Sequence, residues 1–463
     1  MDHYEFVVIG SGPSGRRAAI QAAKLGHSVL VVEKGRRVGG VSVHTGTIPS
    51  KTLRETVLNL TGWRERGFYG RAYRVKARIE SDDLMMRLHK TLDHEVDVLE
   101  HQFARNGVDT AVGEARFTDP HRIEITIGDG ETRTVSAERF LIAVGTRPYR
   151  PETVPFDGKT IFDSHEIVDL PALPRSITVV GAGVIGVEYA TIFSALDVAV
   201  TLIEPRDSIL DFIDREIIAD FIHDLRDRGI VLRMGSAVDS ITHEGKSPVV
   251  HLADGRRVRS EMLLYAAGRV GATDRLNLAC CEIDIDKRGR LAVDSATFQT
   301  SVPHIYAAGD VIGFPSLAST SMEQGRISAC HAFGAPTPPA PDYFPYGIYS
   351  VPEISTVGMS EEEVRERGIP YECGVARFRE TSRGHIMGLD TGMMKMLFSI
   401  KTGRLLGVHI VGEGATELIH IGQAVLNLKG TLDYFIENTF NYPTLAEAYK
   451  IAALDAWNRM PRG

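Results

Sequence analysis

The sequence predicts an α/β fold with two Rossmann-like domains, each built on a parallel sheet, and a smaller C-terminal α+β domain. The order strand, glycine-rich turn, helix and strand occurs twice, beginning near residues 4 and 176. A stretch with five prolines and no apolar periodicity, residues 336–345, predicts a linker before a segment of short strands and helices. The 463 residues are enough for about three domains of roughly 150 residues each.

The first glycine-rich turn has the sequence GSGPSG and follows a short apolar run, residues 4–9, that predicts a buried strand. A helix is expected over 16–25, and a second strand, 28–32, leads to Glu33. Gly10, Gly12 and Gly15 would let the backbone approach a pyrophosphate at the positive end of the helix. Glu33 would accept hydrogen bonds from ribose hydroxyls, so the segment predicts a dinucleotide site.

The same pattern returns in the middle of the chain. A strand over 176–180 precedes the turn GAGVIG, which contains Gly181, Gly183 and Gly186, and a strand over 197–203 runs into Glu204. The acid follows the first glycine by 23 positions in both copies, since 33 minus 10 equals 204 minus 181. Two copies indicate an internal duplication and two bound dinucleotides.

A long amphipathic helix is expected over 81–106, packed on the first domain. Apolar residues recur there at helical spacing, with charged residues between them: Leu84, Leu88, Leu92, Val96, Leu99 and Phe103.

Residues 39–51, with the sequence GGVSVHTGTIPSK, resemble the redox-active segment of the flavin-dependent disulfide reductases, the family of glutathione reductase and dihydrolipoamide dehydrogenase. In that family two cysteines of this segment exchange a disulfide with reduced flavin. Ser42 and Thr47 stand at the cysteine positions here. A hydroxyl group cannot supply a thiolate or form a disulfide, so thiol exchange is excluded at this segment.

Further motifs of that family follow in order. Gly145 follows a predicted strand, 139–144, in the sequence GTRP, and Gly268 follows the strand predicted over 263–267. Residues 300–310 resemble the third flavin signature, in which Asp310 would hydrogen-bond the ribityl chain.

The resemblance covers nearly the whole chain and implies FAD bound non-covalently in the first domain and a nicotinamide nucleotide in the second. It implies an FAD domain formed by 1–150 and 273–340, an NAD(P) domain formed by 151–272, and a dimerisation domain formed by 341–463. It also implies a homodimer, or a higher homo-oligomer, in which each active site is completed across the interface.

The C-terminal motif departs from the family. Residues 441–447, NYPTLAE, match a sequence in which a histidine serves as the base for the thiols, and Tyr442 takes its place. A phenol with a pKa near 10 is a poor base at neutral pH. The resemblance places Lys51 beside flavin N5, Glu188 as its ionic partner, and Thr47 against the flavin, where it can only donate or accept a hydrogen bond.

Three stretches together resemble the soluble pyridine nucleotide transhydrogenases: GTIPSK without cysteines, FNYPT at 440–444, and PSLAS at 315–319. That resemblance implies ping-pong hydride transfer between NADPH and NAD+ through FAD N5. An NAD(P)H-dependent reductase of a quinone or another small oxidant shares these flavin motifs and remains an alternative. Mercuric reductase is disfavoured because the C-terminus has no cysteine pair, and a flavin-bound sensor without turnover is disfavoured by the second fingerprint.

Glu204 favours NAD(H), because a carboxylate accepts from the ribose 2′-hydroxyl and repels a 2′-phosphate. Arg206 could offset that repulsion by pairing with the phosphate. We therefore expect both NAD(H) and NADP(H) as substrates, with NAD(H) bound more tightly.

Composition excludes several classes of function. The net charge of −8, with both signs interspersed, argues against nucleic-acid binding. An acidic start and the lack of a long apolar run predict a cytosolic protein with neither signal peptide nor membrane span. Four cysteines fit neither a disulfide framework nor a zinc spacing, and histidines such as His44, His409 and His420 do not cluster, so no metal site is expected.

Overall fold

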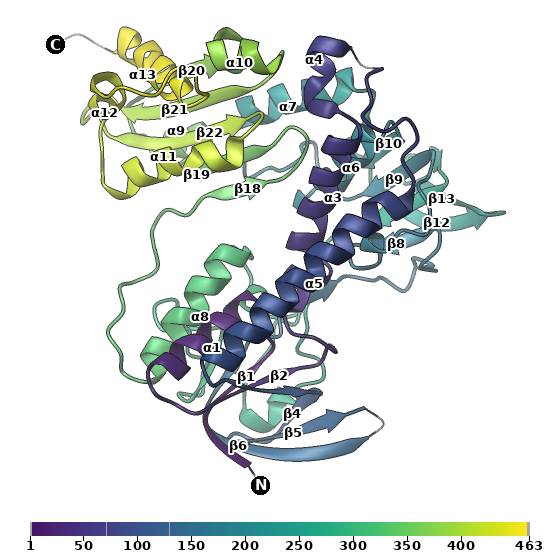
Figure 1. Ribbon diagram of the computed structural model, residues 1–463, viewed down its shortest axis with the longest axis vertical. Coiled ribbons are helices and arrows are strands. Elements are labelled where there is room, and N and C mark those ends of the chain that lie inside the picture. The colour runs from purple at the N-terminus through teal and green to yellow at the C-terminus, as the bar shows by residue number, and fades with distance from the viewer. Residues whose placement is uncertain (1, 71, 129, 461–463) are drawn as a thin grey trace. The chain divides into compact units, whose positions relative to one another are not determined.

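A computed structural model describes residues 2–70, 72–128 and 130–460 as two compact units (Figure 1). The first unit contains Met1–Thr52, Met86–Arg150 and Gly268–Ala340. The second contains Leu53–Met85, Pro151–Ala267 and Pro341–Gly463. The division into three domains with boundaries at residues 150, 272 and 340 stays a prediction.

The first unit is built on a seven-stranded sheet of order β3-β2-β1-β6-β5-β4, with β17 paired to β6. Strands β1, β2, β3, β6 and β17 run parallel, and β4 and β5 join β6 as an antiparallel extension. The strands are β1 (Asp2–Ile9), β2 (Val29–Glu33), β3 (Asp109–Val112), β4 (Glu114–Asp119), β5 (Arg122–Ile127), β6 (Glu131–Ile142) and β17 (Ile305–Ala307).

Helices α1 (Pro13–Lys24) and α8 (Ala318–Ala332) lie side by side next to this sheet (Figure 1). Helix α1 begins three residues before the predicted start, because Pro13 occupies the first turn, where its missing N–H costs no hydrogen bond. The two helices approach closely at Gly325, where a Cβ atom would lie 2.1 Å from the carbonyl oxygen of Ser14. Glycine is therefore required at this crossing.

The long amphipathic helix is confirmed as α5 (Ser81–Arg105). Five of its six predicted apolar positions are at most 3% exposed. Three of these, Val96, Leu99 and Phe103, belong to one apolar core of the first unit, and the sixth position, Leu92, packs partly buried against that core. That core also contains residues of β1, β2 and α1, so the helix covers the first sheet as expected.

Smaller elements complete the first unit. Strands β7 (Thr146–Pro148) and β16 (Arg269–Gly271) form an antiparallel pair. The short helix α2 (Gly40–His44) precedes α3 (Thr47–Leu60), whose residues from Leu53 onward belong to the second unit. The 3₁₀ turns η3 (Leu278–Cys281) and η4 (Asp310–Ile312) flank β17 in sequence.

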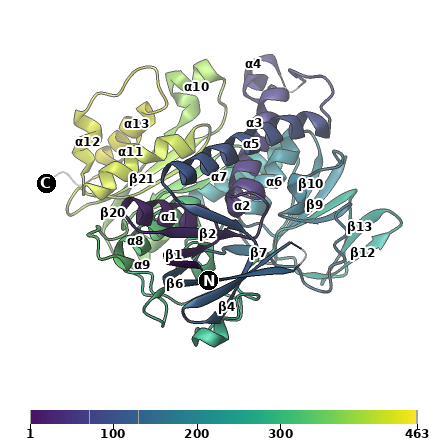
Figure 2. The ribbon, with the colours of Figure 1, turned by 60° about the horizontal axis from the view of Figure 1, so that its bottom comes forward.

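The second unit repeats the nucleotide-binding arrangement with a parallel sheet of order β11-β10-β9-β15-β8. Figure 2 shows β9 beside β10, and a hairpin formed by β12 and β13. Helices α6 (Val184–Ala195) and α7 (Arg215–Asp227) follow β9 and β10. The strands are β8 (Ile161–Asp163), β9 (Ser176–Val180), β10 (Ala199–Ile203), β11 (Val231–Arg233), β12 (Val238–Glu244), β13 (Ser247–Leu252), β14 (Arg257–Arg259) and β15 (Met262–Tyr265).

The C-terminal part of this unit is an antiparallel sheet of order β18-β19-β22-β21-β20. Its strands are β18 (Tyr346–Ile348), β19 (Ile354–Gly358), β20 (Tyr371–Arg377), β21 (Met393–Ser399) and β22 (Leu405–Val411). Helices α11 (Ala415–Asn427) and α13 (Glu447–Arg459) share its apolar core, and the Tyr449 hydroxyl accepts from the Gly422 N–H at 3.1 Å. Residues 336–345 contain no helix or strand, which confirms the predicted linker.

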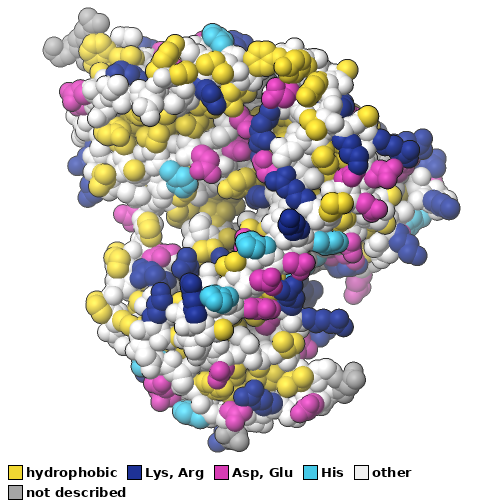
Figure 3. Space-filling view, in the orientation of Figure 1, with side chains coloured by type: hydrophobic (Ala, Val, Ile, Leu, Met, Phe, Trp, Pro, Cys, Tyr) yellow, Lys and Arg dark blue, Asp and Glu magenta, His cyan; other side chains and the backbone are white. Residues whose placement is uncertain are grey.

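No helix among the residues described combines the length and the apolar character that crossing a bilayer requires. Acidic and basic side chains are interspersed over the face seen in Figure 3.

A buried ionic cluster fixes the start of α7 in the second unit. Lys395 of β21 is 1% exposed, and its ammonium group lies 3.0 Å from Asp214, which is fully buried, and also contacts Glu361 and Glu216. Asp214 in turn caps α7 by accepting from the Glu216 N–H at 3.1 Å. Burial alone would raise the pKa of Asp214, but the charges of His409 and Lys395 hold it below its ordinary value. Burial alone would lower the pKa of Lys395, yet its hydrogen bond to Glu361 and the charge of Asp214 raise it.

We expect Lys395→Met to lower the free energy of unfolding by about 3–5 kcal/mol at pH 7, because it leaves buried carboxylates without their cation. The depressed pKa of Asp214 means that its stabilisation is present above about pH 4 and is lost as the pH falls further. The raised pKa of Lys395 means that its stabilisation is present below about pH 10 and is lost above that. Calorimetry gives the melting temperatures of Lys395→Met and of the exposed control Lys401→Met. The difference between these two temperatures should become smaller below pH 4. Equal melting temperatures at pH 7 would contradict the role of the cluster.

Candidate functional site: two dinucleotide cradles

The first glycine-rich turn brings β1, α1 and the end of β6 into close backbone contact. A Cβ atom at Gly10, which has φ +105°, would lie 2.4 Å from the Ala143 carbonyl oxygen. A Cβ atom at Gly15 would lie 1.9 Å from the Gly10 carbonyl oxygen and 3.1 Å from a methyl of Val8. These two glycines are therefore required by the packing of the protein itself.

Gly12 differs from its two neighbours in the motif. Its φ of −63° suits any residue, and a Cβ atom there would meet nothing of the protein within 4 Å. Helix α1 begins directly after Gly12, and its N-terminus has no side-chain cap and no acidic residue in the first turn. Free N–H groups and open space at the positive end of a helix fit a pyrophosphate, so these residues suit the dinucleotide that the sequence predicts.

The second cradle reproduces this geometry almost atom for atom. A Cβ atom at Gly186 would lie 1.9 Å from the Gly181 carbonyl oxygen, and one at Gly181 would lie 2.8 Å from the Ala266 carbonyl oxygen. A Cβ atom at Gly183 would again meet nothing within 4 Å, and α6 also lacks a side-chain cap. The duplication seen in the sequence is thus present in three dimensions.

Each predicted ribose acid lies at the end of the second strand of its sheet and is tied to its own turn. The Glu33 carboxylate accepts from the Ser11 N–H at 3.0 Å, from the Ser11 hydroxyl at 2.5 Å and from the Gly35 N–H at 2.8 Å. The Glu204 carboxylate accepts from the Ala182 N–H at 2.7 Å. Both carboxylates are buried, at 8% and 3% exposed, so the turn and the acid form one rigid unit in each cradle.

In the second cradle the predicted ribose acid pairs with a positively charged side chain, Arg206. The contacts described for the acid of the first cradle, Glu33, include no such cation. The Nε of Arg206 lies 2.8 Å from Glu204 Oε1, its Nη2 donates to Glu204 Oε2 at 3.3 Å, and its Nη1 lies 2.8 Å from Asp211. Burial alone would raise the pKa of Glu204, but hydrogen bonds from Arg206 and Ala182 hold it below its ordinary value. The hydrogen bond to Glu204 likewise raises the pKa of Arg206.

The segment that would carry the redox cysteines packs directly on the first cradle. The Gly39 N–H donates to the Ser11 hydroxyl at 2.8 Å, and a Cβ atom at Gly40 would lie 2.9 Å from Gly12 Cα. The Ser42 hydroxyl donates to the Gly39 carbonyl at 3.1 Å. Thr47 is the first residue of α3 and is exposed on the isolated chain.

Asp310 lies in a polar network formed by the two short strands of the first unit. The Thr146 hydroxyl donates to the Asp310 carboxylate at 3.4 Å, and the Arg269 Nε lies 2.8 Å from the same hydroxyl. Burial raises the pKa of Asp310, while Arg269, Thr146 and Arg290 oppose that rise. Thr146 and Arg269 directly follow Gly145 and Gly268, which adopt positive φ values of +65° and +114°. A Cβ atom at either glycine would meet nothing of the protein within 4 Å.

Three residues of this site were not singled out from the sequence: Ser11, Thr146 and Arg269. Each is adjacent to a glycine of a recognised motif, so position in the motif was the signal available. Their roles depend on contacts between segments more than 20 residues apart, as between Ser11 and Glu33 or Thr146 and Asp310.

Lys51 and Glu188 belong to different compact units. The half-buried Lys51 of α3 donates to the Ser50 hydroxyl at 3.3 Å. Glu188 of α6 is 3% exposed and accepts from the Tyr349 N–H at 2.9 Å. The ionic pair expected between Lys51 and Glu188 stays a prediction.

Tyr442, at the position of the family's histidine, is 71% exposed, and its hydroxyl lies 2.6 Å from that of Ser382. Glu447, at the end of the same motif, has one buried carboxylate oxygen without a hydrogen-bond partner among the described residues.

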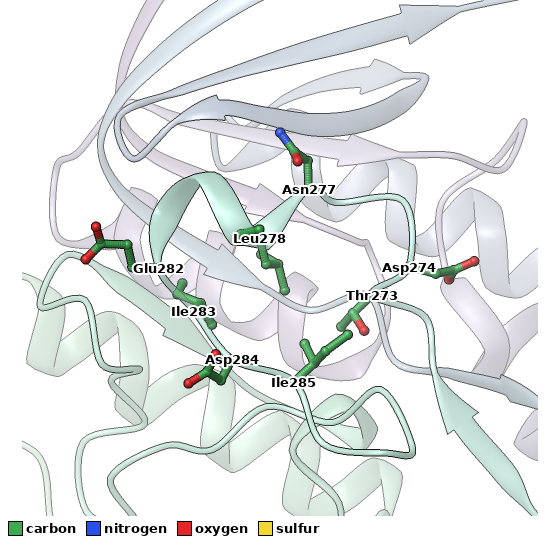
Figure 4. Close-up of a pocket in the computed structure, with 9 residues that line it drawn as sticks. Thr273, Asp274, Asn277, Leu278, Glu282, Ile283, Asp284 and Ile285 are labelled. Atoms are coloured by element: carbon green, nitrogen blue, oxygen red, sulfur yellow. The ribbon is translucent and has the colours of Figure 1, made fainter.

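A pocket of about 640 Å³ lies elsewhere in the first unit, around residues 273–285 (Figure 4). Its carboxylates do not converge, because Asp274 points to the opposite side from Glu282. The neighbouring Cys281 is buried in the core, which raises the pKa of its thiol to about 12 and makes it a poor nucleophile. No group of three or more candidate metal ligands occurs within the described ranges.

Comparisons with known proteins agree with this architecture. Residues 4–325 match the family described as pyridine nucleotide-disulphide oxidoreductase, and residues 344–453 match the dimerisation domain of that family. A soluble pyridine nucleotide transhydrogenase of Mycobacterium tuberculosis is 52% identical over 461 residues, which cover 99% of this chain and 98% of the relative. The protein of the same name from Escherichia coli is 41% identical, with 99% of this chain and 98% of the relative covered.

Solved structures give the same result for the fold. LpdA from Mycobacterium tuberculosis is 27% identical with a TM-score of 0.90, covering 98% of this chain and 99% of that one. The HOCl-induced flavoprotein disulfide reductase RclA from Escherichia coli is 25% identical with a TM-score of 0.88, covering 97% and 99% of the two chains. The predicted fold class is confirmed by this likeness.

The open Cβ position of Gly12 gives a direct test of the first cradle. We expect Gly12→Ala to fold normally and to bind FAD about ten-fold or more weakly, because a methyl group forced into a close contact costs about 1–3 kcal/mol. The ratio of flavin to protein absorbance after purification, with the melting temperature of the apoprotein, measures both effects. Gly15→Ala is the contrasting variant and should destabilise the apoprotein itself. Full flavin content in Gly12→Ala would contradict the assignment.

Proposed function

The chain belongs to the pyridine nucleotide-disulphide oxidoreductase family, and on that premise we propose that it transfers hydride between NADPH and NAD+ without a redox-active disulfide. The observation that carries this proposal is the pairing of two complete dinucleotide cradles with hydroxyl side chains, Ser42 and Thr47, at the positions of the family's thiols. Electrons that enter from one nucleotide have no dithiol to reduce, so a second nucleotide is the natural acceptor.

The first cradle is proposed to hold FAD. Gly12 and the start of α1 would face the pyrophosphate, and Glu33 would accept hydrogen bonds from the ribose. Asp310 would hold the ribityl chain, and Gly145 directly precedes Thr146, which donates a hydrogen bond to Asp310. When bound, FAD supplies the ring nitrogen N5 that accepts and returns the hydride.

The second cradle is proposed to hold the nicotinamide nucleotide through Gly183, Glu204 and Arg206, with Gly268 at the exit of the sheet. With the first cradle assigned to FAD, the residues described offer only the second cradle to the two nicotinamide substrates. NADPH and NAD+ would therefore occupy it in turn, which is the basis for a ping-pong mechanism.

The chain's own residues would act by position and charge. The Lys51 ammonium is proposed to lie near N5, where a positive charge stabilises negative charge that develops during the reaction. Glu188, held by the Tyr349 backbone, would fix the orientation of Lys51. Thr47 would offer only a hydrogen bond, and Tyr442 would not serve as a base. Hydride transfer between nicotinamide and flavin requires orientation more than proton transfer, so the absence of a base is compatible with turnover.

We also propose that the protein works as a homodimer. The match to the family's dimerisation domain over residues 344–453 supports self-association. The exposure of Tyr442 would then allow it to contact the partner's site.

An anaerobic two-step stopped-flow experiment tests the function. NADPH is added to the purified holoenzyme until the flavin absorbance is lost, and an NAD+ analogue whose reduced form absorbs apart from NADPH follows. We expect the flavin absorbance to return at the steady-state turnover rate, together with one equivalent of reduced analogue. If the absorbance returns only when a quinone or oxygen is added, the protein is a reductase of another acceptor and the proposal is wrong.

Glu204→Ala tests the nucleotide site. We expect the KM for NADH to rise about ten-fold, because a hydrogen bond to a charged group contributes about 1.5–3 kcal/mol. The KM for NADPH should fall, because the carboxylate that repels a 2′-phosphate is removed and Arg206 loses one of its partners. Initial rates with each donor, with a melting curve to confirm folding, measure both changes. Unchanged kinetics for both nucleotides would refute the role of Glu204.

A further inference from the structure

The guanidinium group of Arg206 contacts two carboxylates at the second cradle, those of Glu204 and Asp211. Its Nε and Nη2 contact the buried Glu204, and its Nη1 lies 2.8 Å from Asp211 on the loop that leads to α7. The Arg206 side chain is 48% exposed and the Asp211 side chain 54% exposed, whereas Glu204 is only 4% exposed. The inner contact is therefore fixed by the cradle, and the outer contact lies at the surface.

Comparison of the two cradles explains why an arginine can occupy this place. In the first cradle the Ser11 hydroxyl donates to Glu33 and completes the carboxylate's hydrogen bonds. The corresponding residue of the second cradle is Ala182, which offers only its N–H. Arg206 supplies the missing donor to Glu204 through its side chain. A half-exposed cation thus replaces a buried hydroxyl at the acid that would bind the ribose.

Asp211 is exposed, but its backbone is anchored on both sides. Ile209 and Leu210 are 0% and 1% exposed, and Leu210 adopts a left-handed φ of +48° that sets the direction of the loop. Three residues after Asp211, the fully buried Asp214 binds Lys395 and caps α7. The loop therefore brings the Asp211 side chain beside Arg206.

We propose that Asp211 sets the preference between NAD(H) and NADP(H) by holding Arg206 away from the site of the 2′-phosphate. This inference rests on the proposed function, because it assumes that both nucleotides use the second cradle. With Arg206 held by Glu204 and Asp211, the cradle accepts a ribose 2′-hydroxyl. For NADP(H), the guanidinium leaves at least one carboxylate and pairs with the phosphate, so the contact with Asp211 opposes NADP(H) binding and leaves NAD(H) binding unaffected.

The test compares Asp211→Asn with Asp207→Asn on the oxidised holoenzyme. Both substitutions remove one negative charge from the same exposed loop, but Asp207 forms no ion pair with Arg206 among the residues described. Dissociation constants for NADP+ and NAD+ are measured by titration calorimetry, which requires no hydride transfer. We expect D211N to bind NADP+ about two- to five-fold more tightly, as the loss of one exposed ion pair allows, with NAD+ unchanged. D207N should leave the ratio of the two constants nearly unchanged.

Two further variants separate pairing from simple charge. Asp211→Glu retains a carboxylate, so its ratio of the dissociation constants for NADP+ and NAD+ should equal that of the wild type. In an Arg206→Leu background the effect of D211N should disappear, because the residue it acts through is gone. An effect of D211N that equals that of D207N, or that persists without Arg206, would overturn the inference.

The failure of the proposed function gives a different result. A wild-type enzyme that binds NAD+ but not NADP+ would contradict dual nucleotide use. The inference would then be decided by whether D211N gains NADP+ binding, since no gain would overturn it as well.

Discussion

Both nucleotide folds of this chain depend on one backbone contact, the approach of the third fingerprint glycine to the carbonyl oxygen of the first. At Gly15 and at Gly186 a Cβ atom would lie 1.9 Å from that oxygen, which no side chain could tolerate. The contact draws the helix onto the strand before it and directs the free N–H groups of its first turn into open space. The acids Glu33 and Glu204 then bind the turn from the neighbouring strand and complete each cradle.

Contacts with the first cradle explain how the segment that begins at Gly39 keeps its place with Ser42 and Thr47 at the positions of the family's cysteines. The segment that begins at Gly39 is held by the Ser11 hydroxyl and by the approach of Gly40 to Gly12. These contacts are made by backbone atoms, glycines and one hydroxyl group, and sulfur takes no part in them. Ser42 and Thr47 are therefore compatible with the place of this segment on the first cradle.

The two cradles share a backbone and differ in one donor to the acid. The first acid accepts a hydrogen bond from the neutral Ser11 hydroxyl, whereas the second pairs with Arg206, an ionic partner that is about half exposed. We propose the first arrangement for FAD and the second for the nicotinamide nucleotides that exchange. The two cradles thus combine nearly identical turns with different side chains at the acid.

Glycine spacing and apolar periodicity are local properties of the chain, so they were enough to predict the fold class, the two fingerprints and the long amphipathic helix. The residues at positions 42 and 47 are likewise read directly from the chain, and neither is a cysteine. Only the folded structure shows that Ser11, Thr146 and Arg269 join the site, that Gly12 and Gly183 face open space, and that Arg206 lies between Glu204 and Asp211. The contacts of Ser11 and Thr146 join segments that are distant in the sequence, so they form only when those segments meet in the folded chain. The contacts of Arg206 depend on side-chain conformations within one loop, which no sequence pattern encodes.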